Sequence, residues 1–207
     1  MSAKNNKPRA LVIGGSLGGL CAGVCLRAAG WCVSIFERST GLMDDRGAGI
    51  VLQFEVLNRE ADQLPALLTD RTGRKRRTSV PPGMVCPEHW QKQMDIARAF
   101  LPPQLRELLE ATQEPFVQPI RDLAVPQMVF DRTVLVGEAA FVLRPHTAAA
   151  AAKAAADGMV LGEALRDGDE NFTENLQRFE APQMEMGLNL RNYGIRAGNQ
   201  SQFPRDP

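Results

Sequence analysis

Short apolar runs and one helical pattern alternate along the first forty residues of the chain. One apolar run starts at Ala10 and ends at Gly14, and a second occupies residues 31–36. Apolar runs of this length, bounded by glycine, are typical of buried parallel strands. Between them, residues 21–29 have a helical pattern, and Gly30 is placed to end that helix. The order predicts a strand, a helix and a second strand in one βαβ unit.

The rest of the chain predicts a mixture of helices and extended segments. The alanine-rich stretch predicts a helix because alanine is the strongest helix former, with Pro145 near its start and Thr147 as a candidate cap. The expected elements, in order, are a β-hairpin over residues 66–80 with its turn at Thr72-Gly73, amphipathic helices over 88–100 and 102–112, an extended segment over 116–128, a strand over 131–137, the alanine-rich helix up to about Leu165, a helix over 179–195 and a frayed tail over 198–207.

The glycine-rich turn after the first strand has the pattern of a dinucleotide site. Such a turn brings backbone N–H groups and the positive end of the next helix to a pyrophosphate. Gly14 suits the tight turn, Gly19 permits close helix–strand packing, and Ser16 adds a hydroxyl that can donate to a phosphate. Glu37 follows Gly14 by 23 residues, where an acid accepts hydrogen bonds from ribose hydroxyls. The alternative is an ordinary βαβ turn without a ligand.

Composition and charge argue against two classes of protein, nucleic-acid binders and membrane-spanning proteins. The chain has 207 residues, enough for one domain or two small ones, and 24 residues of each charge sign. A net charge of zero argues against a general nucleic-acid binder. The first strand begins soon after Met1 behind a polar lead, and no apolar run approaches the roughly 18 residues of a membrane span. We therefore expect a cytoplasmic protein without a membrane span.

The reactive and charged side chains indicate no metal site. The two histidines, His89 and His146, do not form a metal-ligand pattern with the four cysteines. Cys21 and Cys25 lie one helical turn apart and are expected to be small buried apolar residues. The basic run at residues 74–77 is typical of a solvated strand edge, although a localisation signal or nucleic-acid patch has the same composition.

Three segments together resemble the flavin-dependent aromatic hydroxylases of the para-hydroxybenzoate hydroxylase type. They are residues 14–19, Glu37-Arg38 and residues 137–147, which end in Arg-Pro-His-Thr. The Gly-Gly-Ser form of the first motif is most similar to the 2,6-dihydroxypyridine hydroxylase branch. Residues 47–53, 80–83 and 144–147 share that similarity.

The resemblance implies FAD as the cofactor and NAD(P)H as a transient reductant. The activity that it implies is hydroxylation of a small aromatic or heteroaromatic ring. The residues that it implies for cofactor binding are Gly14, Gly15, Ser16 and Leu17 at the pyrophosphate, Gly19 in the same motif, Glu37 at the ribose with Arg38 beside it, Gly137 and Glu138 at the ribityl chain, Pro145, His146 and Thr147 near the flavin ring, and Gln53. It names no catalytic residue. His146 is a candidate near the flavin, but a histidine at a helix start more often caps or packs.

The chain also departs from that family. Glu138 replaces an aspartate, which places the carboxylate one methylene further out, and Ala150 replaces a glycine. The larger departure is length: the family pattern breaks near residue 57 and resumes at once, which indicates an internal deletion. The expected fold is therefore an incomplete α/β Rossmann-like FAD/NAD(P)-binding fold, with residues 1–57 as its first part, 58–130 as a remnant of the substrate domain and 131–207 as its last strand and helices.

The missing middle leaves more than one function open. It would have carried most of the substrate pocket, which puts hydroxylase activity itself in question. The alternative is a non-catalytic nucleotide-binding or interaction remnant, whose uncovered sheet edges and apolar faces favour self-association. A simple NAD(P)-binding reductase would explain the first motif and Glu37 but would give residues 137–147 no role.

Overall fold

The computed structural model describes residues 7–40, 63–168 and 171–202. The chain divides into two compact units. The first, called here the end unit, comprises Met1–Gly47 and Arg121–Pro207, and the second, the middle unit, comprises Ala48–Ile120. No helix within the described ranges is long and apolar enough to cross a bilayer.

The end unit begins with the predicted βαβ unit. Strand β1 (Arg9–Ile13), helix α1 (Leu17–Ala28) and strand β2 (Cys32–Phe36) follow in order, and the two strands pair in parallel from Arg9↔Cys32 to Ile13↔Phe36. The strand predictions are confirmed to within a residue, and Gly30 has a φ of +92° just beyond the helix. The helix begins earlier than predicted, at Leu17, because two glycines that suggested a turn lie inside its first turn.

The later strands of the end unit are shorter than predicted. Strand β3 (Leu123–Ala124) pairs with β6 (Phe141–Val142), and β4 (Val129–Phe130) pairs with β5 (Thr133–Val134), both antiparallel. The extended segment over 116–128 and the strand over 131–137 were therefore largely wrong. Asp131 turns the chain with a φ of +53°, and Gly137 opens the 3₁₀ turn η1 (Gly137–Ala139).

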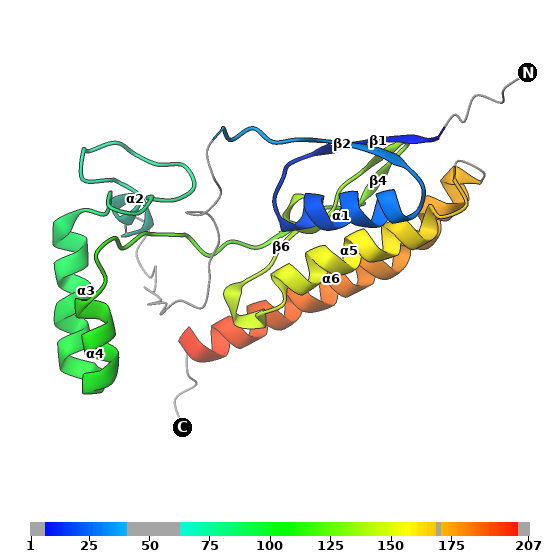
Figure 1. Ribbon diagram of the computed structural model, residues 1–207. Helices are drawn as coiled ribbons and strands as arrows, with labels where there is room; N and C mark the ends of the chain where they lie inside the picture. The colour runs from blue at the N-terminus through cyan, green and yellow to red at the C-terminus, as the bar shows by residue number, and fades with distance from the viewer. Residues whose placement is uncertain (1–6, 41–62, 169–170, 203–207) are drawn as a thin grey trace, which may run out of the picture. The chain divides into compact units, whose positions relative to one another are not determined.

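Two long helices complete the end unit, and α5 (Ala150–Ala164) lies between α1 and α6 (Phe172–Gln202) (Figure 1). The alanine-rich helix is confirmed. The tail prediction was wrong for residues 198–202, which are helical. In this turn Gly198 lies against Arg144 and His146, and the Asn199 side chain accepts a hydrogen bond from Arg144.

Thr147 does not cap α5 as predicted. It ends the 3₁₀ turn η2 (Pro145–Thr147), and Ala149 occupies the N-cap position of α5. The Thr147 hydroxyl donates to the Arg144 carbonyl at 3.0 Å and accepts from the Ala149 N–H at 3.1 Å. It therefore closes the turn that leads into the helix, and Ala148 with a φ of +48° makes the change of direction.

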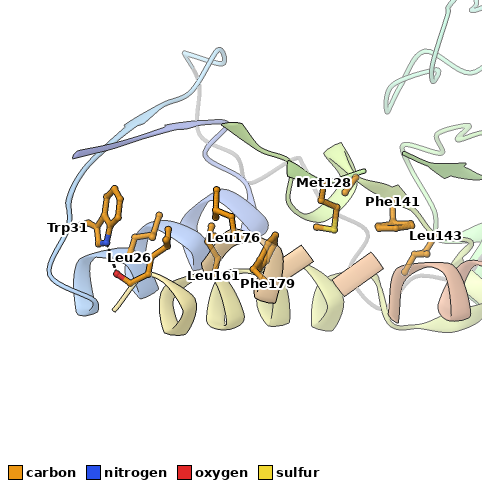
Figure 2. Close-up of a cluster of buried hydrophobic side chains, with 10 residues drawn as sticks. Leu26, Trp31, Met128, Phe141, Leu143, Leu161, Leu176 and Phe179 are labelled. Atoms are coloured by element: carbon orange, nitrogen blue, oxygen red, sulfur yellow. Dashed lines mark hydrogen bonds between the residues drawn. The ribbon is translucent and has the colours of Figure 1, made fainter. Parts of the chain in front are cut away.

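Large apolar side chains from every layer of the end unit form its core (Figure 2). The buried members include Leu26, Trp31, Met128, Phe141, Leu143, Leu161, Leu176 and Phe179. The Trp31 indole N–H donates to the Leu165 carbonyl at 2.8 Å, which ties the start of β2 to the end of α5. On β1, Val12 faces α1, whereas Leu11 and Ile13 are exposed.

Helices α1 and α5 approach closely because glycines line their contact. A Cβ added to Gly158 would lie 2.7 Å from the Ala22 nitrogen, and one added to Gly162 would lie 2.7 Å from the Cys25 Cβ. These distances are shorter than van der Waals contact, so no larger residue fits there without moving a backbone. Cys21 and Cys25 are free cysteines. Both are half-buried, whereas the sequence predicted that they would be buried.

The middle unit consists mainly of helices. They are α2 (Gln63–Leu67), α3 (Pro87–Phe100) and α4 (Pro103–Glu110), and the two amphipathic helices are confirmed. Met94, Ala97 and Leu109 form a small core between α3 and α4. The predicted hairpin is shorter than expected, because the first residues of its first strand lie in α2. Its turn at Thr72-Gly73 is present, and the bridge Thr69↔Lys75 and backbone hydrogen bonds join its two sides.

A buried aspartate also stabilises this turn. The Asp70 carboxylate accepts from the Thr72 hydroxyl at 2.6 Å, from the Thr72 and Arg74 backbone N–H groups, and from the Arg76 guanidinium at 2.6 Å. These bonds, led by that of the Thr72 hydroxyl, hold the pKa of Asp70 far below its ordinary value despite burial. Arg76, part of the run predicted to be a solvated edge, is thus a structural partner.

We expect acid to destabilise the Asp70 loop. A carboxylate whose pKa is lower in the folded state stabilises that state above its ordinary unfolded value, about 3.9, and loses this contribution as the pH falls toward the lowered one. Between about pH 6 and about pH 2, the midpoint of thermal unfolding should therefore fall more steeply in the parent than in Asp70→Asn. The variant should already be less stable than the parent at neutral pH. Parallel pH profiles for the two proteins would contradict this account.

Candidate functional site

The glycine loop between β1 and α1 is held by backbone contacts that only glycine allows. Gly14 has a φ of +109°, and its N–H donates to the Phe36 carbonyl at 2.8 Å, which joins the ends of β1 and β2. A Cβ on Gly19 would lie 1.9 Å from the Gly14 oxygen. The first turn of α1 therefore packs directly against the loop, as the sequence predicts for this motif.

The start of α1 offers backbone donors without a negative charge. Ser16 is the N-cap residue, its hydroxyl makes no capping hydrogen bond, and the first turn holds no acidic residue. The earliest N–H of the helix with an intrahelical partner is that of Leu20, which donates to the Ser16 carbonyl at 2.9 Å. The preceding N–H groups have no intrahelical acceptor by helical geometry, and the helix dipole adds positive potential. This end of α1 is suited to an anion.

Glu37 joins the glycine loop to the end of β2. Its Oε2 accepts from the Gly15 N–H at 2.8 Å, and its Oε1 accepts from the Ser39 N–H at 2.7 Å. Arg38 follows on the surface. The carboxylate thus stands beside the loop at the position where the sequence places a ribose acceptor.

The second predicted segment meets the first at η1. Gly137 is buried with a φ of +59°, and a Cβ added to Gly18 would lie 3.7 Å from the Gly137 Cα. On the other side, a Cβ on Gly137 would lie 3.2 Å from the Ala154 Cβ of α5. Glu138, the next residue, is exposed. The structure therefore brings the glycine loop and the Gly137–Glu138 turn together.

The third predicted segment, η2, has its main contacts with α6 (Figure 1). A Cβ on Gly194 would lie 2.8 Å from the Thr147 Cγ2, and one on Gly198 would lie 2.9 Å from the His146 Cε1. Before η2, Arg144 forms a bidentate ion pair with Asp122, with its Nη2 2.8 Å from Oδ2. Pro145 is exposed, while His146 and Thr147 are half-buried. Gln53 lies outside the described residues.

Two charged residues that sequence reasoning missed lie behind this junction. Lys153 and Asp157 are 3% and 0% exposed, and the Lys153 Nζ lies 2.5 Å from the Asp157 Oδ1. The other oxygen, Oδ2, accepts from the Gly137 N–H at 2.8 Å. Burial raises the pKa of Asp157, and the bonds from Lys153 and Gly137 oppose that shift. Their spacing of four residues next to Gly158 and Gly162 was the available signal. In the described ranges, no group of three or more side chains could hold a metal.

Known proteins with similar sequences include flavin-binding proteins and a monooxygenase. Residues 43–122 match the family model of FAD binding domain-like proteins. The chain is 32% identical over 128 residues to 2,6-dihydroxypyridine 3-monooxygenase of Paenarthrobacter nicotinovorans, a match that covers 62% of this chain and 32% of that protein. Over part of its length, the chain is therefore similar to FAD binding domain-like proteins and to this monooxygenase. It spans about a third of the length of that curated relative, and the resemblance predicted from the sequence is confirmed.

Solved structures agree with this relationship and with the α/β fold. The structure of 2,6-dihydroxypyridine-3-hydroxylase from Arthrobacter nicotinovorans matches with a TM-score of 0.66 and 29% identity, over 72% of this chain and 37% of that one. Klebsiella pneumoniae HpxO, complexed with FAD and uric acid, matches with a TM-score of 0.67 over 95% of this chain and 89% of that one. At 14% identity, the HpxO match supports the fold alone.

Proposed function

We propose that the chain binds FAD and acts as the flavin-binding part of an NAD(P)H-dependent monooxygenase of aromatic or heteroaromatic rings. The observation that carries the proposal is the junction in the end unit, where Gly18 of the first motif lies against Gly137 of the second. Two segments more than a hundred residues apart in the sequence thus form one surface with backbone donors, a free helix start and two carboxylates.

The residues at this junction fit the parts of FAD. The loop of Gly14, Gly15, Ser16 and Leu17 would line the pyrophosphate. Its donors would be Ser16, Leu17 and the start of α1, because the N–H groups of Gly14 and Gly15 already have acceptors within the protein. Glu37 would accept from the ribose hydroxyls, and Glu138 from the ribityl hydroxyls. When bound, FAD supplies acceptance of a hydride from NAD(P)H and activation of O₂. The chain's own part is to bind and orient the cofactor and to place its charges.

The names of the relatives support a proposal for the substrate class. The curated relative acts on 2,6-dihydroxypyridine, and one solved neighbour was captured with uric acid. Both are electron-rich nitrogen heterocycles, so we propose a ligand of that chemistry. The chain spans only about a third of the curated relative. For this reason the alternative of a nucleotide-binding remnant stays open, and it predicts cofactor binding without turnover.

The test is retention of flavin by the purified chain. We expect that incubation with FAD followed by desalting leaves a yellow protein with the two visible flavin bands, and that NADPH bleaches them. FMN is the matched control, because it lacks the pyrophosphate-linked adenosine that the glycine loop and Glu37 would hold. A colourless protein after FAD, or equal retention of FMN and FAD, would refute this proposal.

A further inference from the structure

The buried pair Lys153–Asp157 is the most unusual electrostatic feature of the end unit. Both residues lie on α5, one helical turn apart, and both side chains are almost fully shielded from water. The Lys153 Nζ also lies 4.8 Å from the centre of the Phe141 ring, and that ring is packed against Gly187 of α6. The cation is therefore enclosed by α5, β6 and α6 rather than extended toward solvent.

Such a pair is a poor means of stabilising a fold. Removing two charges from water costs about as much as their attraction returns, and apolar side chains of similar volume often fill the same space equally well. The pair therefore calls for an explanation beyond packing. The Asp157 carboxylate supplies one, because Lys153 holds Oδ1 while Oδ2 accepts from the Gly137 N–H at 2.8 Å.

Gly137 is the point at which the two cofactor segments meet. Its left-handed φ of +59° opens η1 and sets the direction of Glu138. Gly137 itself is buried, so its N–H would lose its acceptor if Asp157 were replaced by an apolar residue. Lys153 fixes the carboxylate through the opposite oxygen, so the orientation of the turn depends on both members of the pair.

We propose that Lys153 and Asp157 are positioning residues of the cofactor site, which hold the Gly137–Glu138 turn against the start of α1 so that Glu138 faces the ribityl hydroxyls. This inference rests on the proposed FAD site. It assigns the pair an effect on cofactor affinity and on the local order of η1, beyond any effect on the stability of the whole unit.

Two double variants separate positioning from general stabilisation. Lys153→Met/Asp157→Leu removes the charges and the acceptor, whereas Lys153→Met/Asp157→Asn removes the charges and keeps an acceptor for the Gly137 N–H. We expect the leucine variant to raise the Kd for FAD, measured by flavin fluorescence quenching, about ten-fold. The asparagine variant keeps the acceptor but loses the lysine that fixes it, so its Kd should rise only about three-fold. Hydrogen exchange without FAD should show faster exchange at residues 137–139 in the leucine variant than in the asparagine variant.

Other outcomes would overturn the inference. An unchanged Kd in the leucine variant, or exchange at residues 137–139 that rises only in step with exchange in α5, would assign the pair a purely structural role. If the leucine variant does not fold, Lys153→Met alone serves, with an expected rise in Kd of about three-fold, and an unchanged Kd would have the same meaning. If the parent does not bind FAD, the proposed function fails, and the exchange comparison still decides whether the pair orders the turn.

Discussion

Replacing Gly158 by valine is expected to force α1 away from α5 and to destabilise the end unit. A Cβ at this position would lie 2.7 Å from the Ala22 nitrogen and 2.8 Å from the Cys21 carbonyl carbon. Both are backbone atoms of a helix and cannot move aside as a flexible side chain can. Overpacking commonly costs about 1–3 kcal/mol, a large share of a domain's total stability of about 5–15 kcal/mol. We expect the midpoint of thermal unfolding to fall by at least about 5 °C.

The neighbouring residue provides the matched control. Met159 lies on the same helix and is 65% exposed, so Met159→Val introduces the same β-branched side chain without a clash. Its effect should stay within about 0.5 kcal/mol, as for most surface substitutions. Circular dichroism on both variants makes the comparison. Equal unfolding midpoints would show that the α1–α5 contact tolerates a larger residue, contrary to the geometry.

Replacing Gly19 by alanine is expected to damage both stability and flavin binding. The added Cβ would lie 1.9 Å from the Gly14 oxygen, so either the helix or the loop must move. That movement would displace the N–H groups that we propose for the pyrophosphate. We expect a loss of about 2 kcal/mol or more in the free energy of unfolding. Retention of FAD after desalting should fall with it.

Gly18→Ala is the control for this prediction, one residue away on the same helix. A Cβ there would lie 3.6 Å from the Ala154 Cβ, an ordinary contact. Alanine is a better helix former than glycine by about 1 kcal/mol, so this variant should be as stable as the parent or more so. If the two alanine variants unfold at the same temperature, the close approach of α1 to the loop is not what requires Gly19.

Local sequence patterns were sufficient to predict the first βαβ unit and the main helices. Two apolar runs marked β1 and β2, and Gly30 marked the end of α1. Alanine content marked α5, and amphipathic spacing marked α3 and α4. The predicted strands failed where side-chain hydrogen bonds and turns set the backbone, because the spacing of apolar residues does not report either. Asp70 gathers its loop through side-chain hydrogen bonds, and Asp131 and Gly137 turn the chain with positive φ.

For the candidate site, the sequence indicated the residues but not their arrangement. It singled out residues 14–19, Glu37 and residues 137–147 from motif and resemblance, and the roles of individual residues in cofactor binding stay predictions. It did not indicate that Glu37 bonds to Gly15, or that η2 packs on α6. Those facts depend on which atoms meet across the fold, and sequence spacing does not report them.

The sequence by itself determined the elements whose signals are local: strands from apolar runs, helix ends from glycine, and the glycine loop from a motif with its own backbone requirement. Only the tertiary structure decided which face of α5 is buried. On a helix of alanines, Lys153 and Asp157 would ordinarily face water, since burying a charge is costly. They lie inside because α5 is packed between α1 and α6, and because the Gly137 N–H supplies a partner that is distant in sequence.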